Sequence, residues 1–308
     1  MEIPQYPKTA PIELTIRSLL HPRLSMLADG VSEYTFAGLY LFRDTYDYKL
    51  SLLPEDKLLI TGTKEGKSFF MLPCGFPEQD DRLVEELFGT YDYLKGLSEA
   101  NADPIRIRME RLGLEIVEDR DNFDYLYLRE DLSELTGKKY HKKRNHVNAF
   151  INNYHYDEQP LRIGAIDDAR SILEKWQEGR EGSTDYAAAR EALDLYAELE
   201  LKGYIVYVDG SPAAYTIGEP LMRGRSFVVH FEKAVESYRG IYQFINKAFA
   251  TILPRHYTYI NREQDLGDEG LRQSKMTYRP CGFVKKYRVD APGQEQHKYD
   301  ESAERNSA

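Results

Sequence analysis

The order of apolar segments and turn signals between residues 203 and 289 is the feature that most constrains the fold. Residues 203–209 predict a strand and residues 212–218 its return strand, joined at Asp209-Gly210-Ser211, where glycine supplies the positive φ of a tight hairpin. Residues 226–231, nearly all apolar, predict a third strand. A glycine-bearing turn follows, and then a helix at 241–253, a strand at 257–261, a helix at 267–276 and a strand at 283–289. This mixed order predicts an α+β or α/β fold.

The first half of the chain mixes strands and helices in the same way. Residues 57–63 and 67–73 alternate apolar and polar side chains around Lys64-Glu65-Gly66, which predicts a hairpin. Helical spacing is expected at 15–29 and 78–96. The aromatic segment 34–47 is compatible with a helix or a buried strand. Further strands are predicted at 105–111, 114–118 and 125–128.

The length of 308 residues favours two domains. We predict an N-terminal domain over residues 1–156, which ends in a basic linking helix, and a C-terminal domain over residues 157–290. Helical spacing at 167–180 and 185–201 opens the second domain. The polar tail 291–308 lacks apolar periodicity and is predicted to be disordered.

Composition excludes several classes of protein. Two cysteines, Cys74 and Cys281, do not make a disulfide scaffold, and no metal-ligand spacing is found, so we expect no metal. No stretch approaches the ~18–20 apolar residues of a membrane span. The N-terminal residues lack the basic start and apolar run of a secretory signal. We therefore predict a cytoplasmic protein without a membrane span.

One segment is basic, although the formal net charge is −10. Its five basic side chains are those of Lys138, Lys139, Lys142, Lys143 and Arg144. It continues as a helix with Val147, Phe150, Ile151 and Tyr154 on one face. Such a local patch could contact nucleic-acid phosphates or a substrate. A solvated helix face packed between domains is the alternative.

Gly240 lies in a turn between the strand at 226–231 and the helix at 241–253. A helix start offers free backbone N–H groups and a positive dipole, which together make an anion site. Glycine permits close approach of a phosphate, and Arg239 adds a cation. Taken alone, such a turn is more typical of an ordinary capped helix start.

The order of elements and two motifs resemble the GNAT acyltransferases. Ser237, Gly240 and Tyr242 stand at the first, central and last positions of that family's pyrophosphate loop, Gln/Arg-x-x-Gly-x-Gly/Ala, and only the glycine matches strictly. The motif Tyr-x-x-x-Gly-Phe is matched by Tyr278-Arg279-Pro280-Cys281-Gly282-Phe283. The resemblance implies that Tyr278 protonates the thiolate of departing coenzyme A. A core tyrosine is the alternative.

The same resemblance implies a set of residues that bind acyl-CoA as co-substrate. They lie on the third strand, in the glycine turn and after the next strand: Val229, His230, Phe231, Ser237, Tyr238, Arg239, Gly240, Ile241, Tyr242 and Asn261. In the strand, the backbone amides are expected to make the contacts. The His230 side chain, within an apolar run, is more typical of a hydrogen-bonded core histidine than of a catalyst.

Two carboxylates, Glu263 and Asp265, follow the strand at 257–261. Ligand chemistry in open α/β sheets gathers at strand ends. If the strand persists, both side chains share one face, where either could activate or orient an amine. The alternative for Asp265 is a cap on the helix that starts near Gly267.

Three segments resemble a bacterial family grouped with the C-terminal domain of phosphatidylglycerol lysyltransferase. They are the stretch from Asn261 to Arg272, Lys275-Met276-Thr277-Tyr278-Arg279-Pro280, and the basic stretch from Lys138 to Asn145. The resemblance covers nearly the whole chain. It implies two GNAT-like domains in tandem, as in the FemABX peptidyltransferases, each with a mixed central sheet flanked by helices.

Three functional hypotheses follow. The first is a GNAT-type transferase that moves an acyl group from acyl-CoA to an amine or hydroxyl of a small-molecule or peptide acceptor. The second is an aminoacyltransferase that uses aminoacyl-tRNA, because the resembling lysyltransferases move an aminoacyl group from tRNA to a lipid headgroup. The third is a non-catalytic ligand-binding module of the same fold.

Overall fold

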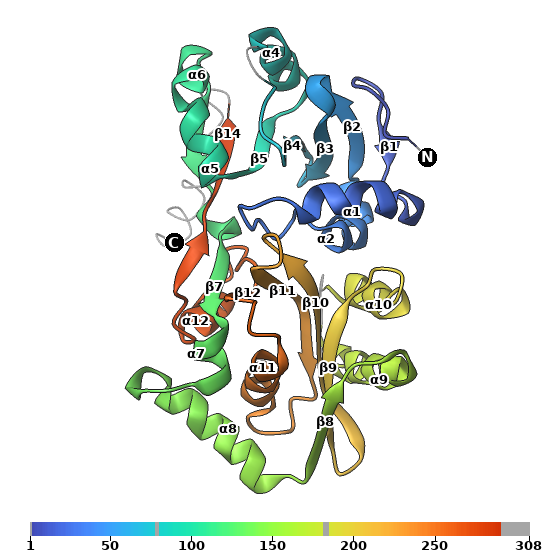
Figure 1. Ribbon diagram of the computed structural model, residues 1–308, viewed down its shortest axis with the longest axis vertical. Helices are drawn as coiled ribbons and strands as arrows, with labels where there is room; N and C mark the ends of the chain where they lie inside the picture. The colour runs from blue at the N-terminus through green and yellow to red at the C-terminus, as the bar shows by residue number, and fades with distance from the viewer. Residues whose placement is uncertain (1, 78–79, 181–184, 291–308) are drawn as a thin grey trace, which may run out of the picture. The chain divides into compact units, whose positions relative to one another are not determined.

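The computed structural model describes residues 2–77, 80–180 and 185–290 (Figure 1). The predicted tail lies outside these residues. Two compact units divide the chain. Within the described residues the first unit comprises 2–17, 43–123 and 284–290, and the second comprises 18–42 and 124–283.

The first unit is built on a seven-stranded mixed sheet of order β1-β2-β3-β4-β5-β14-β6. Its strands are β1 (Ala10–Pro11), β2 (Lys49–Leu53), β3 (Lys57–Lys64), β4 (Lys67–Met71), β5 (Tyr93–Ser98), β6 (Glu115–Glu118) and β14 (Lys286–Asp290). Its α-helices are α3 (Arg43–Tyr46), α4 (Asp81–Thr90), α5 (Glu99–Ala102) and α6 (Arg106–Arg111). The predicted β3–β4 hairpin is confirmed, and Gly66 takes a φ of 77° in its turn.

Two predictions in the first unit are wrong. Residues 106–111 form helix α6, although Ile105, Ile107 and Met109 alternate as in a strand. Only Met109 of these three is buried, while Ile107 is 81% exposed, so the alternation does not mark a buried face. The predicted helix at 78–96 ends at Thr90, and β5 begins at Tyr93. The helical spacing of leucines there ran across two different elements.

The second unit contains a seven-stranded mixed sheet of order β13-β7-β12-β11-β10-β9-β8. Its strands are β7 (Asp124–Leu128), β8 (Tyr156–Pro160), β9 (Lys202–Val208), β10 (Ser211–Leu221), β11 (Ser226–Ala234), β12 (Tyr259–Asn261) and β13 (Gly282–Val284). The sequence predicted β9, β10, β11 and β12 in this order. The mixed α+β class of the whole chain is confirmed.

Helices cover both faces of the second sheet. The α-helices of this unit are α1 (Arg17–Ser25), α2 (Phe36–Leu41), α7 (Arg129–Glu134), α8 (His141–Asn153), α9 (Ile166–Gln177), α10 (Tyr186–Asp194), α11 (Ile241–Ile252) and α12 (Glu269–Met276). Helices α9 and α10 lie on one side of the sheet and α11 lies on the other (Figure 1). Helix α8 packs on α11, with the rings of Phe150 and Phe244 4.5 Å apart. The aromatic segment 34–47 is helical.

The two units do not follow the boundary predicted at residue 156. Strand β7, from the first half of the chain, pairs with β12 and so belongs to the second sheet. Strand β14, from the end of the chain, lies between β5 and β6 in the first sheet. The single strand predicted at 283–289 is therefore two strands, β13 and β14, in different sheets. Each sheet is completed by a strand from the other half of the sequence.

Candidate functional site

The central strands of the second sheet part from each other partway along. The parallel pair β11–β12 is in register only from Ser226 opposite Tyr259 to Val228 opposite Asn261. Strand β12 ends there, whereas β11 continues to Ala234. Opposite the step from Ile217 to Gly218, the pairing on β11 jumps from Phe231 to Val229. His230 is thus the extra residue of a β-bulge, a feature often found beside active sites.

Tyr278 lies at the centre of a group of polar side chains that we call the Tyr278 cluster. Its members are Lys143, Glu232, Gln243, Arg262 and Tyr278. The Lys143 Nζ lies 3.7 Å from the centroid of the Tyr278 ring, and the Arg262 guanidinium lies 5.0 Å from it. Arg262 also forms an ion pair of 3.0 Å with Glu232. The cluster joins β11, α8, α11 and the segments that follow β12 and α12.

The Tyr278 hydroxyl is buried, and burial favours its protonated form. The ring is only 4% exposed, and burial raises the pKa of Tyr278 to about 12. Arg262 and Gln243, which can donate to the phenol oxygen, lower the pKa of Tyr278 in part. A phenol with its oxygen so engaged keeps its own O–H for another acceptor.

Helix α8 delivers Lys143 to this cluster. Burial and the neighbouring Arg262 lower the pKa of Lys143 to about 8. The other predicted basic residues are used differently. Lys139 pairs with Asp131 at 2.8 Å, and Arg144 donates to the carbonyls of Leu135 and Gly137. Lys138 and Lys142 are exposed.

A second polar group surrounds the bulge. The His230 Nε2 lies 3.0 Å from Glu219 Oε1, and its Nδ1 lies 2.8 Å from Glu263 Oε1. Burial opposes a charge on this imidazole, but the hydrogen bonds to Glu219 and Glu263 raise the pKa of His230 to about 10. The histidine is therefore an imidazolium at neutral pH. We call these three side chains the carboxylate–histidine clamp.

Glu263, one of the two predicted bases, belongs to this clamp and keeps partial access to solvent. Its side chain is 26% exposed, whereas that of Glu219 is 3% exposed. Its backbone has a φ of 55°, a left-handed conformation that is costly for a residue other than glycine. Lys275 holds this backbone, because its Nζ donates to the carbonyls of Arg262, Glu263 and Gln264.

Asp265, the other predicted base, is fully engaged in structural contacts. Its buried carboxylate accepts hydrogen bonds from the Tyr125 hydroxyl at 2.5 Å and from Arg272 at 2.7 and 2.9 Å. Burial alone would raise the pKa of Asp265, but the hydrogen bonds from Arg272 and Tyr125 hold it well below the usual range. The cap of α12 is Asp268, and Asp265 instead accepts from the Gly267 N–H.

The glycine turn is packed against helix α8. Gly240 precedes α11 with a φ of 89°, and a Cβ built there would lie 2.1 Å from the His146 carbonyl oxygen. The Arg239 N–H donates to the Tyr154 hydroxyl, and the Ile241 N–H donates to the Tyr238 carbonyl. The close approach of two backbones therefore requires this glycine, and one side of the turn faces a carbonyl oxygen.

Other residues predicted to bind a cofactor contribute to the interior. Asn261 is buried, donates to the Gly30 carbonyl and to Asp124, and accepts from the Glu263 N–H. Val229 belongs to the core beneath α11. The Phe231 ring stacks on Phe42. Tyr242 and Tyr238 are partly buried, while Ser237 is exposed.

The sequence did not predict the partners of these side chains. Glu219, Glu232, Gln243 and Arg262 come from four separate segments, and only the fold brings them together. One available signal was a charged residue inside an apolar strand, as at Glu219. Within the described residues, no group of three or more His, Cys, Asp or Glu side chains is arranged to hold a metal ion. No helix there is long and apolar enough to cross a membrane.

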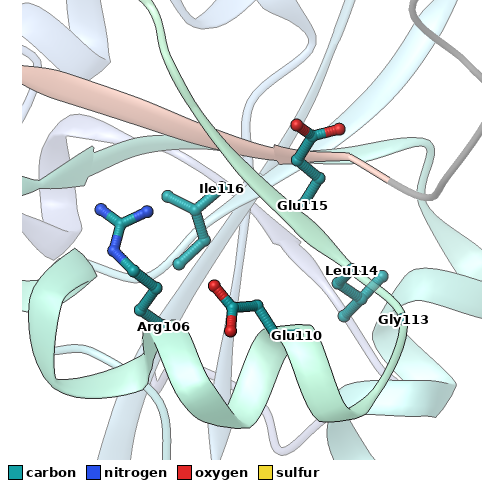
Figure 2. A pocket seen from close by; sticks show the side chains of 6 residues that line it. All are labelled: Arg106, Glu110, Gly113, Leu114, Glu115 and Ile116. Carbon is teal, nitrogen blue, oxygen red and sulfur yellow. The ribbon is translucent and has the colours of Figure 1, made fainter.

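A surface hollow of about 460 Å³ lies in the first unit. Figure 2 shows the residues that line it, on α6, on the turn after α6 and on β6: Arg106, Glu110, Gly113, Leu114, Glu115 and Ile116. None of the residues predicted for the site lines this hollow. The candidate site therefore remains the Tyr278 cluster and the carboxylate–histidine clamp of the second unit.

The fold of this chain is similar to that of FemX. The structure of FemX superposes with a TM-score of 0.56 at 7% identity, over 91% of this chain and 96% of that one. Residues 25–290 match the family model described as phosphatidylglycerol lysyltransferase, C-terminal, and the chain belongs to this family. The family and the FemABX-like fold expected from the sequence are both confirmed.

Two further structures are similar over nearly the whole chain. A conserved protein of unknown function from Bacteroides thetaiotaomicron is 32% identical, with a TM-score of 0.81 over 92% of this chain and 99% of that one. L-PGS from Bacillus licheniformis is 12% identical, with a TM-score of 0.60 over 96% of both chains. The chain is thus related to aminoacyltransferases by family and by fold.

Proposed function

We propose that this chain is an aminoacyltransferase that takes its aminoacyl group from the ester of an aminoacyl-tRNA. The observation that carries this proposal is the buried Tyr278 phenol, with the cations Lys143 and Arg262 against its ring. Burial keeps this phenol protonated at neutral pH, so it can give its proton to a strongly basic leaving group. The ribose alkoxide of an ester is such a group, whereas a thiol, with an ordinary pKa of ~8.5, leaves readily as a thiolate.

The proposed reaction uses three parts of the second unit. An amine or hydroxyl of the acceptor attacks the ester carbonyl, and the bond from carbonyl carbon to ribose oxygen breaks. Tyr278 gives its proton to that oxygen, and Glu263 accepts the proton of the acceptor. Backbone N–H groups at the bulge, around His230, would stabilise the carbonyl oxygen as negative charge develops on it.

The basic side chains of α8 support a nucleic-acid donor. Lys142 on α8 and Lys138 in the turn before it are exposed, and Lys143 on α8 reaches Tyr278. A phosphate backbone that follows this helix would lead its 3′ end towards the cluster. Binding to such a surface weakens steeply as salt increases, because counterions are released on association.

Acyl-CoA is a second candidate donor, favoured by the turn at Gly240. The first N–H groups of α11, at Tyr242 and Gln243, precede the first intrahelical hydrogen bond of Phe244 to Gly240. Such groups can hold a pyrophosphate. The pyrophosphate would then be surrounded by Ser237, Tyr238, Arg239 and Ile241. The His146 carbonyl beside Gly240 disfavours an anion, so we rank this donor second.

The test compares the two donors on the purified full chain. We expect tRNA charged with labelled amino acids to bind in filter assays, with affinity falling at least tenfold between 50 and 200 mM salt. Uncharged tRNA is the control for the aminoacyl group. Acetyl-CoA is expected to leave the melting temperature unchanged, since only a ligand of the native state raises it. A rise with acetyl-CoA, together with no binding of charged tRNA, would overturn the proposal.

A further inference from the structure

We propose that Lys143, Arg262 and Gln243 form a subsite for a phosphate group of the donor, next to the Tyr278 hydroxyl. This inference rests on the proposed function, because it places one phosphate of the donor close to the bond that breaks. All members belong to the second unit, and they come from α8, from the segment after β12 and from α11.

The balance of charge in the Tyr278 cluster points to an anionic ligand. The cluster holds two cations, Lys143 and Arg262, and the carboxylate of Glu232 pairs with Arg262 at 3.0 Å. Among the ion pairs of the described residues, none includes Lys143. Its ammonium lies against the Tyr278 ring and near Arg262. A partly buried ammonium beside a second cation is unfavourable until an anion joins it.

The donors in this cluster suit a phosphate. Arginine presents a planar fork that matches phosphate oxygens, and lysine adds up to three N–H groups. Gln243 lies in the first turn of α11, where the helix dipole also favours a negative charge. Arg262 lies against the Tyr278 ring, and Gln243 also acts on the hydroxyl, so a phosphate bound by both would lie next to that hydroxyl.

The groups facing Lys143 predict how pH acts on binding. They are Arg262, the Tyr278 ring and, behind Arg262, Glu232. Burial and Arg262 lower the pKa of Lys143 to about 8 in the free protein, and a bound phosphate would raise it. Binding above pH 8 therefore requires proton uptake. The affinity should fall about fivefold from pH 8 to pH 9.

The experiment measures binding of inorganic pyrophosphate by calorimetry between pH 7 and 9. Lys143→Met should weaken binding at pH 7 by roughly 10- to 100-fold, the loss of one charge-assisted contact. Lys143→Arg should bind at pH 7 and lose the dependence on pH, since arginine stays charged. Lys175→Met, an exposed lysine of α9, is the matched control and should behave as the wild type.

Two results would overturn the subsite. One is unchanged affinity in a folded Lys143→Met variant. The other is an alkaline loss of binding that persists in Lys143→Arg, which keeps the inference testable if the methionine variant does not fold.

Two further probes separate the source of the phosphate. A cytidylyl-adenosine carrying a 3′-aminoacyl amide should bind Lys143→Met more weakly than it binds the wild type. This loss would support an RNA donor. If coenzyme A alone loses affinity, the subsite stands and the aminoacyl-tRNA function fails.

Discussion

His230→Gln tests the carboxylate–histidine clamp most directly. The substitution keeps hydrogen-bonding groups but removes the positive charge between Glu219 and Glu263. Glu219 is 3% exposed and cannot be solvated in place, so the loss resembles the breaking of a buried ion pair, about 3 to 5 kcal/mol. Since Glu263 is 26% exposed, we expect the lower end of that range.

The pH dependence gives the sharper test. The pKa of His230 rises from 6.5 to about 10 on folding, so the imidazolium contributes stability that is complete below pH 6.5 and is lost as pH rises to 10. A shift of this size corresponds to about 5 kcal/mol at most. The wild type should therefore lose stability between pH 7 and 10 relative to His230→Gln.

Urea unfolding at several pH values measures this difference. Both proteins carry Lys143 and Lys275, which also titrate in this range, so the difference between their unfolding free energies isolates His230. His256→Gln, an exposed histidine after α11, is the control and should follow the wild type. If the difference in unfolding free energy between wild type and His230→Gln stays constant from pH 7 to 10, His230 does not carry a stabilising charge in the folded protein.

Three further substitutions address the rest of the site. Tyr278→Phe should lower turnover by about 10²- to 10⁴-fold without weakening donor binding. The control is Tyr196→Phe, at a buried tyrosine outside the cluster, which should keep full activity. Equal turnover of the two variants would show that Tyr278 is not the acid. Gly240→Ala should destabilise the protein by about 2 kcal/mol or more, because the φ of 89° is costly for alanine and the new Cβ would lie 2.1 Å from the His146 carbonyl oxygen. An unchanged urea midpoint would show that α8 does not pack against this glycine. Asp265→Asn should lower the free energy of unfolding by about 3 kcal/mol at pH 7. Since folding lowers the pKa of Asp265, this loss should vanish only at acid pH. If wild type and variant differ in unfolding free energy by the same amount down to pH 3, Asp265 is not held as a carboxylate by its partners.

Local patterns in the sequence predicted the second sheet well. The hairpin of β9 and β10 is encoded by two largely apolar segments on either side of a glycine turn, and β11 by an apolar run. Such signals depend on neighbouring residues only. Segment 105–111 misled because its alternation matches a strand although the residues form α6, with Ile107 exposed.

The positions of β7 and β14 could not be predicted in the same way. Neither segment carries a local mark of the sheet that it joins, since pairing partners lie far away in the sequence. The boundary expected at residue 156 followed the order of the chain and missed this exchange.

The site shows the same limit. Tyr278, Glu263 and Lys143 were named from motifs and from a charged stretch, but their roles depend on partners in other elements. Arg262 and Gln243 define the state of the Tyr278 hydroxyl, and Glu219 defines that of His230. Gly240 shows the converse. A glycine at a helix start fits a phosphate loop and a tight helix contact equally well, and only the His146 carbonyl reveals the second reason.

The place of β14 has a consequence for synthesis on the ribosome. This strand lies between β5 and β6, in the interior of the first sheet, yet it comprises residues 286–290. Strands β5 and β6 are synthesised long before β14, so the edges that pair with β14 lack their hydrogen-bonding partner until it is made. Unpaired strand edges are prone to aggregation. The nascent chain therefore has an incomplete first sheet until β14 emerges, and separate expression of either half would leave both sheets incomplete.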